Sequence, residues 1–215
     1  MSYIDGYFDR SSDIIRVVER QNKERVFKEY PIKYTFYHED PSGKFKSTTG
    51  KPLSRIVCKN TKDFHKELAI NRNKTLFESD INPMFQCLSE NYLNKDAPDL
   101  NIAFFDIEAD FDPEKGFSQP NDPFMPITAI TVSLQWLDTM VTFAMPPKTM
   151  GIEEAKEITK GIDNLYLYKD EADMLKAFLD IIEDADVISG WNSEGYDLPY
   201  IINRIKKVMS KDDTR

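Results

Sequence analysis

The feature that most constrains the fold is a point where a strongly apolar stretch runs directly into two acidic residues. Residues 102–105 are all apolar and predict a buried strand. Side chains alternate between the two faces of a strand, so Asp106 and Glu108 should leave one face while Ile107 returns to the core. Two such carboxylates repel each other, and a divalent cation with oxygen ligands would relieve the repulsion. The sequence therefore predicts a metal site at a strand end.

An acid-x-acid pattern alone is a weak signal. Residues 110–112 and 184–186 repeat the same spacing, and roughly one or two such patterns arise by chance in a chain this rich in acids. Two things distinguish Asp106 and Glu108: the apolar run before them and a second motif far downstream. If Asp106 and Glu108 were only solvated acids at a strand end, neither the apolar run nor the second motif would be required.

Charge and cysteine content narrow the class of protein. The 215 residues carry a net charge of −9, from 28 basic and 37 acidic residues, which argues against a simple basic-patch nucleic-acid binder. An enzyme that reaches phosphates through metal ions remains compatible with this charge. Cys58 and Cys87 lack zinc-ligand spacing, and only two histidines are present. With no signal sequence or membrane-length apolar run, the chain is expected to be soluble and cytoplasmic.

The first 99 residues predict a small α+β domain. Residues 14–19 and 25–36 predict two strands joined as a hairpin, because polar residues separate two β-branched and aromatic runs. A helix should be capped at residues 60–61, and a second helix should begin near Pro83. The aromatic residues of these strands could stack on nucleic-acid bases, but strand aromatics usually pack a core, and we interpret them so.

Residues 96–99 break the helical pattern and predict the boundary to a second domain, residues 100–215. After the strand with the two acids and a proline-rich loop, alternation predicts a half-buried strand over residues 130–136, paired antiparallel with residues 140–145. The order of the remaining elements predicts a mixed sheet with helices packed on it. These elements are a short helix at 153–159, a strand at 165–168, a helix capped by Asp170, a buried strand at 186–190 and an amphipathic helix at 198–209.

The second motif lies between that last strand and last helix and reads Gly190-Trp-Asn-Ser-Glu-Gly-Tyr-Asp197, followed by Leu-Pro-Tyr-Ile. Asp-Ile-Glu on a strand, followed about ninety residues later by Asn-x-x-x-Tyr-Asp, resembles the first and second exonuclease motifs of family-B DNA polymerases. The amino-acid sequence of the second motif is most similar to that of the replicative polymerases of T-even-type phages. Residues 77–81 precede a helix and then the first motif. This segment is similar to the one by which the family joins its N-terminal domain to its proofreading domain.

The resemblance implies that residues 100–215 form a ribonuclease-H-like 3′→5′ exonuclease domain acting on the single-stranded 3′ end of DNA. Such domains use two Mg²⁺ or Mn²⁺ ions held by four carboxylates from three motifs. By position, Asp106 would bind both ions, Glu108 the ion that activates the attacking water, and Asp197 the second ion. Asn192 and Tyr196 would position the 3′ end. Taken alone, Asp197 would be interpreted as a helix N-cap, with proline in the first turn.

The family's third motif, Tyr-x-x-x-Asp, should follow the second and supply the fourth carboxylate. Two such patterns, at residues 92–96 and 166–170, precede the second motif and are in the wrong order. After the second motif the only acids are Asp212 and Asp213, and the polymerase motifs are also absent. The sequence is therefore expected to be an N-terminal piece of a polymerase, truncated before its third exonuclease motif, and inactive by itself.

Two other interpretations stay open. The chain could be one subunit of a split phage polymerase, an interaction module that docks a second polymerase chain. That interpretation expects an apolar surface around residues 187–189 and the last helix. Alternatively, it could be a stand-alone ribonuclease-H-like nuclease, which requires another carboxylate within ligand reach of Asp106. A phage origin would put any of these proteins in the host cytoplasm.

Overall fold

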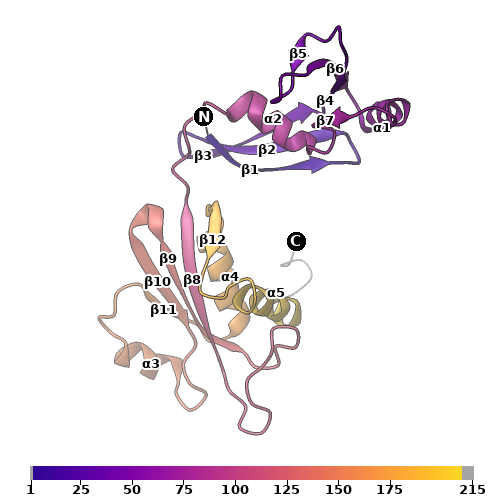
Figure 1. Cartoon of the computed structure of the whole chain (residues 1–215). Helices are drawn as coiled ribbons and strands as arrows, with labels where there is room; N and C mark the ends of the chain where they lie inside the picture. The colour runs from indigo at the N-terminus through magenta and orange to yellow at the C-terminus, as the bar shows by residue number, and fades with distance from the viewer. Residues whose placement is uncertain (1, 210–215) are drawn as a thin grey trace. The chain divides into compact units, whose positions relative to one another are not determined.

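The structure is a computed structural model, and it describes residues 2–209. Its Cα positions divide into two compact units, Met1–Asp99 (unit 1) and Leu100–Arg215 (unit 2) (Figure 1). The acids Asp212 and Asp213 lie outside the described residues. Within residues 2–209 no helix is long and apolar enough to cross a membrane.

The first sheet of unit 1 is an antiparallel meander of three strands, β1 (Ser2–Asp9), β2 (Ile14–Gln21) and β3 (Glu24–Pro31). The predicted hairpin is confirmed as β2 and β3. Its turn residues, Asn22 and Lys23, both have positive φ, at 52° and 71°. This is the turn geometry whose twist matches that of paired strands. Strand β1 has no counterpart in the sequence prediction.

The second sheet of unit 1 has the order β5-β6-β4-β7. The strand predicted over residues 25–36 is in fact two strands. The first ends with β3, and the chain then passes into the second sheet as β4. The short connection between the two strands is held by a hydrogen bond from the main-chain N–H of Ile32 to the Asp13 carbonyl, at 3.0 Å. The strands of this sheet are β4 (Tyr34–Glu39), β5 (Phe45–Lys46), β6 (Pro52–Cys58) and β7 (Leu76–Phe77).

Both predicted helices of unit 1 are confirmed, as are the predicted cap of the first and the predicted start of the second. Helix α1 (Thr61–Ile70) begins after Asn60, whose side chain accepts from the N–H of Asp63 at 2.7 Å. Helix α2 (Pro83–Tyr92) begins with Pro83, where the missing N–H costs nothing. Helix α1 packs on a core that includes Tyr34 and Phe36, so these two strand aromatics are core residues as interpreted.

Unit 2 is built on a five-stranded mixed sheet of order β11-β10-β9-β8-β12. Strand β9 is antiparallel to both β8 and β10, whereas β12 is parallel to β8 and β11 is parallel to β10. The mixed sheet and the antiparallel central pair are as the sequence predicts. The strands are β8 (Ile102–Ala109), β9 (Ile127–Leu134), β10 (Thr139–Ala144), β11 (Leu165–Leu167) and β12 (Val187–Ser189).

Two strand predictions in unit 2 are wrong in detail. Strand β9 ends at Leu134, and Gln135–Leu137 form a short 3₁₀ turn that Asp138 closes in a left-handed conformation, with φ at 48°. The alternation that extended the strand to residue 136 thus continues into a turn. Strand β12 was expected to be buried, but it is an edge strand with exposed Val187 and Ile188.

The helices of unit 2 are α3 (Ile152–Ile158), α4 (Glu171–Ile182) and α5 (Asp197–Val208). The predicted cap of α4 is confirmed, since Asp170 accepts from the N–H of Asp173 at 3.0 Å. Helices α4 and α5 contact each other and lie together on one side of the sheet (Figure 1). Phe178 of α4 and Tyr200 of α5 are fully buried in the core that these helices share with the sheet. The whole chain is thus of mixed α/β and α+β class.

Candidate active site

Strand β8 carries the first two candidate ligands on one face. Along the strand Phe105 and Ile107 are buried, whereas Asp106 and Glu108 are exposed. The strict alternation of a pleated strand is responsible. In the register with β9, Asp106 lies opposite Thr131. The two carboxylates therefore leave the sheet on the face that is not filled by the core.

Asp197 comes to this region from the other end of the unit's sequence. It is the first residue of α5 and only 5% exposed. The N-cap position belongs to Tyr196, and no side-chain capping bond is made there. The interpretation of Asp197 as an ordinary cap is therefore wrong.

The electrostatics of Asp197 are unusual for a helix start. Among the described residues its Oδ2 is buried and has no hydrogen-bond partner. Burial, and secondly the charge of Asp106, raise the pKa of the Asp197 carboxyl. A buried acceptor without a donor costs about 1–3 kcal/mol. A cation shared with the neighbouring carboxylate would satisfy both, so these residues fit a divalent ion.

Glu108, the remaining predicted metal ligand, does not complete a cluster with the other two carboxylates. Within residues 2–209 no three His, Cys, Asp or Glu side chains are arranged to hold a metal ion. The structure thus brings Asp106 and Asp197 together, while Glu108 shares the strand face of Asp106 without completing a cluster. The site has the composition of a metal centre but not a finished coordination sphere.

The segment between β12 and α5 turns tightly around Asn192. Asn192 has a positive φ of 55°, and its carbonyl accepts from the N–H groups of Gly195 and Tyr196 at 3.0 and 2.9 Å. A Cβ on Gly195 would lie 2.5 Å from the Asn192 side-chain oxygen, so a larger residue there would displace that side chain. Asn192 itself is exposed at the surface next to Trp191, which is 91% exposed.

Tyr196 is half-buried rather than open to solvent. Its ring stacks on Tyr200 with 5.4 Å between the ring centroids, and its hydroxyl donates to the Ser118 carbonyl at 3.1 Å. One face of the ring and its hydroxyl are thus engaged within the protein. Whether a DNA end contacts the rest of the ring stays a prediction.

The Ser118 contact belongs to a larger arrangement that the sequence analysis missed. One side of α5 contacts residues 118–126, the second half of the loop that connects β8 to β9. Four of the five loop acceptors are main-chain carbonyls, and we call the arrangement the α5 latch. Its donor–acceptor pairs are Tyr196–Ser118, Tyr200–Met125, Asn203–Pro120, Arg204–Pro123 and Lys207–Asp122, at 2.8–3.1 Å. The spacing of these donors along α5 follows a helical face and could have been found in the sequence.

The latch is anchored by a buried ion pair between helices. Arg204 on α5 binds Glu171 on α4 through Nε and Nη2, and both side chains are more than nine-tenths buried. Glu171 Oε1 also accepts from the N–H of Ile127, the first residue of β9, at 2.8 Å. The helix bearing Asp197 is therefore tied to the connection that follows the strand bearing Asp106.

A hollow of about 460 Å³ opens beside Asp106. The residues that line it include Phe104, Gly190 and Trp191. A Cβ on Gly190 would lie 2.2 Å from the Phe105 carbonyl oxygen, so only glycine permits this approach of β12 to β8. The hollow places aromatic surface and a candidate metal ligand side by side.

Comparison with known proteins decides the family. The family model described as "DNA polymerase family B, exonuclease domain" matches residues 54–214, most of the chain. The chain belongs to this family. The resemblance seen in the two sequence motifs is thereby confirmed at the level of the family and its exonuclease domain.

Individual relatives agree with the family. The DNA-directed DNA polymerase of Escherichia phage RB69 is 26% identical over 225 residues, which cover 93% of this chain and 25% of the relative. That of Enterobacteria phage T4 is 24% identical, covering 91% and 24%. The DNA polymerase catalytic subunit of Saimiriine herpesvirus 2 (strain 11) is 31% identical over 118 residues, covering 53% and 11%. This family-B chain thus spans about a quarter of the length of its phage relatives.

Proposed function

We propose that this chain is the N-terminal and partial proofreading region of a DNA-directed DNA polymerase, and that its exonuclease site is formed by Asp106, Glu108 and Asp197. The observation that carries the proposal is the buried, unpartnered Asp197 Oδ2 beside the Asp106 carboxylate. A protein retains such an arrangement at a cost in stability, and that cost is offset when a cation binds. The family membership supports the same assignment.

The substrate proposed for this site is the single-stranded 3′ end of DNA. Two bound Mg²⁺ or Mn²⁺ ions would supply an activated water and stabilise both the attacking and the leaving oxygen of the phosphodiester. Asp106 and Asp197 would hold them from two separate elements, with Glu108 next along the strand. Asn192 and Tyr196 would position the 3′ end at the hollow beside Asp106.

We further propose that this chain alone has little exonuclease activity and no polymerase activity. It supplies three of the four carboxylates that the family resemblance implies, and phosphoryl chemistry depends on a complete, preorganised set. Appending a segment that carries the third motif should restore exonuclease activity. A completed chain that stays inactive would refute the assignment of Asp106, Glu108 and Asp197.

Calorimetric titration with Mn²⁺ tests the site directly. The wild-type chain is compared with Asp106→Ala and Asp197→Asn, and with Glu157→Gln as a control that removes an exposed acid on α3. We expect both site variants to lose the Mn²⁺ heat and the control to keep it. Equal binding by wild-type protein and Asp106→Ala would contradict the assignment.

The interaction-module alternative has one observation in its favour. Val187 and Ile188 of β12 and Ile202 of α5 are exposed by 37–49%, so the expected apolar residues do reach the surface. A second polymerase chain docking there would bury them. Sedimentation of this chain mixed with the remaining polymerase region would detect such a complex, and Ile188→Glu should weaken it. The stand-alone nuclease needs a further carboxylate near Asp106, and residues 2–209 offer no cluster of three.

A further inference from the structure

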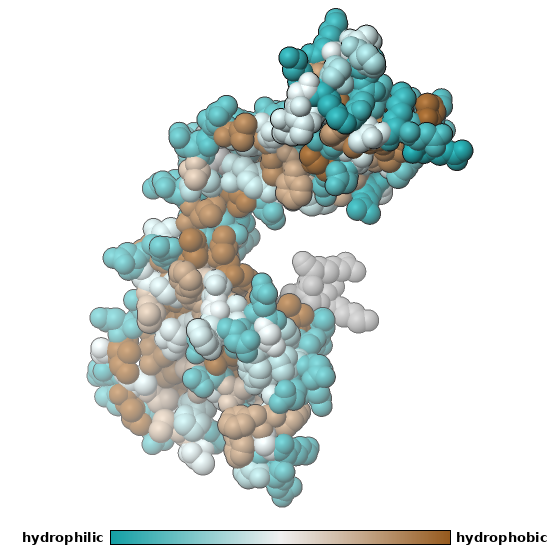
Figure 2. All heavy atoms as spheres, in the orientation of Figure 1, coloured by the Kyte–Doolittle hydropathy of each residue, from teal (hydrophilic) through white to brown (hydrophobic). Residues whose placement is uncertain are grey.

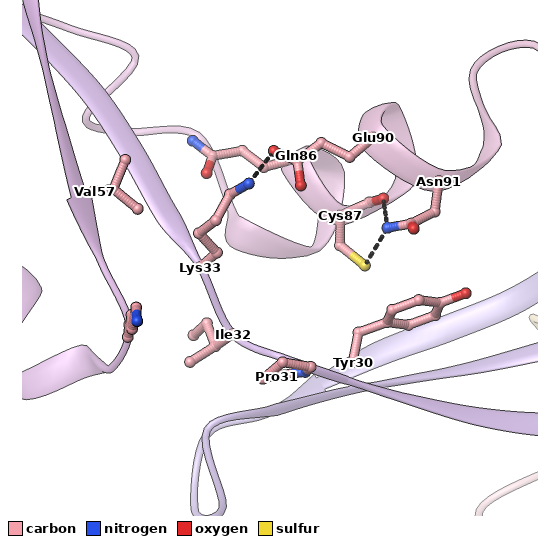
Figure 3. Close-up of a pocket in the computed structure, with 10 residues that line it drawn as sticks. Tyr30, Pro31, Ile32, Lys33, Val57, Gln86, Cys87, Glu90 and Asn91 are labelled. Carbon is pink, nitrogen blue, oxygen red and sulfur yellow. Dashed lines mark hydrogen bonds and ion pairs between the residues drawn. The ribbon is translucent and has the colours of Figure 1, made fainter.

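Unit 1 contains a hollow of about 480 Å³ between α2 and the second sheet. In Figure 3, Val57 of β6 lies across from the residues of α2, and the connection from β3 to β4 runs along a third side. The volume falls within the range of ligand sites. All residues that line the hollow belong to unit 1, so it is separate from the acids of the exonuclease site.

Apolar groups make up much of the lining of this hollow. Ile32 and Cys87 are buried, at 3% and 8% exposure, whereas Val57 is 43% exposed. Burial raises the pKa of the Cys87 thiol, so this group stays neutral and behaves as a small apolar one. An exposed valine beside two buried apolar residues offers apolar surface that a ligand can remove from water. The hollow thus favours an apolar group as its occupant.

The uncharged polar side chains that line the hollow are already engaged within the protein. The Gln86 amide donates to the Thr35 carbonyl at 2.6 Å and accepts from the Thr35 N–H at 2.8 Å. The Asn91 amide donates to a main-chain carbonyl one turn before it at 2.9 Å, and the hydroxyls of Tyr30 and Tyr92 share a hydrogen bond of 2.9 Å. A nucleobase in the hollow would therefore bury the polar atoms of its edge with few partners left for them. A hydrocarbon side chain needs none.

Two lysines add positive charge to the hollow. Lys33 forms an ion pair with Glu90 of α2, and both side chains are partly exposed. Exposed pairs of this kind contribute little to stability, so a carboxylate from another molecule can replace Glu90 as the partner of Lys33 at small cost. Lys59 also lines the hollow and is exposed. The hollow therefore offers two cations to a ligand that combines an apolar group with negative charge.

The segment that contains Lys59 is strongly basic. Residues 41–75 include nine Lys or Arg and only two Asp or Glu, and all nine cations are exposed. This segment forms β5, β6 and α1 with their connecting loops, and Figure 2 shows hydrophilic side chains covering this end of unit 1. Such segregation creates a local positive potential although the whole chain has a net charge of −9. The potential attracts acidic partners and repels basic ones.

We propose that the hollow binds an acidic peptide segment of a partner protein, with one apolar side chain of the segment in the hollow and flanking Asp or Glu side chains on Lys33 and Lys59. The apolar lining and the two lysines each match one part of such a segment. An apolar peptide without acids would leave the positive charge unmatched, and an acidic peptide without an apolar residue would leave the hollow unfilled. The proposal concerns unit 1 alone and is independent of the exonuclease assignment.

Fluorescence anisotropy with a designed peptide tests the proposal on the full chain. The probe is a fluorescein-labelled peptide of about ten Asp and Glu residues with one leucine at its centre. We expect this peptide to bind. The same peptide with serine in place of leucine should bind about 10- to 100-fold more weakly, because it lacks the side chain that leaves water in the hollow. A peptide in which lysine replaces the acids should not bind. This comparison needs no protein variant, so no folding defect can imitate its result.

Protein variants test whether the peptide binds at the hollow. Val57→Asp places a carboxylate in the apolar lining and should weaken binding at least about tenfold. Lys59→Ala should weaken it about two- to fivefold. Glu90→Gln should strengthen it by a similar factor, because the change removes a like charge and frees Lys33. Lys66→Ala is the matched control, since Lys66 is an exposed lysine of the same basic segment that does not line the hollow; it should change the affinity less than about twofold.

A leucine peptide that does not bind, or that binds no better than the serine peptide, would overturn the proposal. So would equal losses of affinity in Lys59→Ala and Lys66→Ala, which would indicate attraction by the whole basic segment rather than binding at the hollow. Displacement of the peptide by unlabelled oligothymidylate at lower concentration than by unlabelled peptide would also overturn it, and would assign the hollow to nucleic acid.

Discussion

Replacing Arg204 by alanine is the most demanding test of how unit 2 is held together. Arg204 and Glu171 are buried and joined by two hydrogen bonds, and Glu171 also fixes the start of β9 through Ile127. The variant would leave the Glu171 charge in the interior with one main-chain donor, and it would release the Pro123 carbonyl from the α5 latch. Both changes lower the stability of the folded state.

The expected magnitude follows from burial. Removing one partner of a buried ion pair costs about 3–5 kcal/mol, because the remaining charge stays desolvated. A domain of this size has about 5–15 kcal/mol of total stability. Arg204→Ala should therefore remove about a fifth of the stability of unit 2 or more. Lys207→Ala breaks an exposed latch contact to Asp122 and should cost about 1 kcal/mol or less.

The chain carries a built-in probe for this comparison. Its two tryptophans, Trp136 and Trp191, both lie in unit 2, so tryptophan fluorescence reports the unfolding of that unit alone. Urea titrations of wild-type, Arg204→Ala and Lys207→Ala proteins would give the two free-energy changes. Equal changes for the two variants would refute the claim that the buried pair, rather than the surface contacts, anchors α5.

Three further predictions concern acids and a glycine. Burial alone would raise the pKa of Glu19, but hydrogen bonds from a lysine, a tyrosine and a glutamine hold it at about 2. This carboxyl should therefore contribute about 3 kcal/mol of stability to unit 1 that is lost as the pH falls from 4.5 through 2. Glu19→Gln should reduce the acid dependence of tyrosine circular dichroism and leave the share of Asp9 and Asp40, whose pKa values are also lowered to about 2. Burial and a neighbouring carboxylate raise the pKa of Asp197 above 3.8, so the stability of unit 2 in EDTA should fall as pH rises from 3.8 to the raised pKa. Asp197→Asn should remove that loss and also abolish stabilisation by Mn²⁺ in thermal unfolding. Gly190→Ala should cost at least about 2 kcal/mol, because the added Cβ meets the Phe105 carbonyl at 2.2 Å, whereas Gly151→Ala, with nothing within 4 Å, should change the urea midpoint little.

Local signals in the sequence predicted local structure well. Asn60 and Pro83 mark helix starts because capping and proline geometry act within one turn. Asp106 and Glu108 share a strand face because alternation needs no knowledge of the rest of the chain. These features depend only on neighbours along the chain, which the sequence itself supplies.

Features that depend on distant partners were not predicted. Glu171 and Arg204 are separated by 33 residues, and each alone looks like a solvent-exposed charge on an amphipathic helix. The exposure of Val187 depends on which strand lies at the sheet edge, a property of topology rather than of composition. The family motif connected Asp197 to Asp106, but its missing hydrogen-bond partner became visible only in three dimensions.

The α5 latch has a consequence for how this region can change. Tyr196, Tyr200, Asn203 and Arg204 each donate to a main-chain carbonyl of the loop. Every residue type offers the same carbonyl, so the loop can exchange many of its side chains while its path over the helix is kept. Variation, natural or engineered, can therefore alter the side chains that this loop presents at the surface without disturbing the helix that carries Asp197. Substitutions on this face of the helix should be tolerated less well, because each of its hydrogen-bond donors to the loop is a particular side chain.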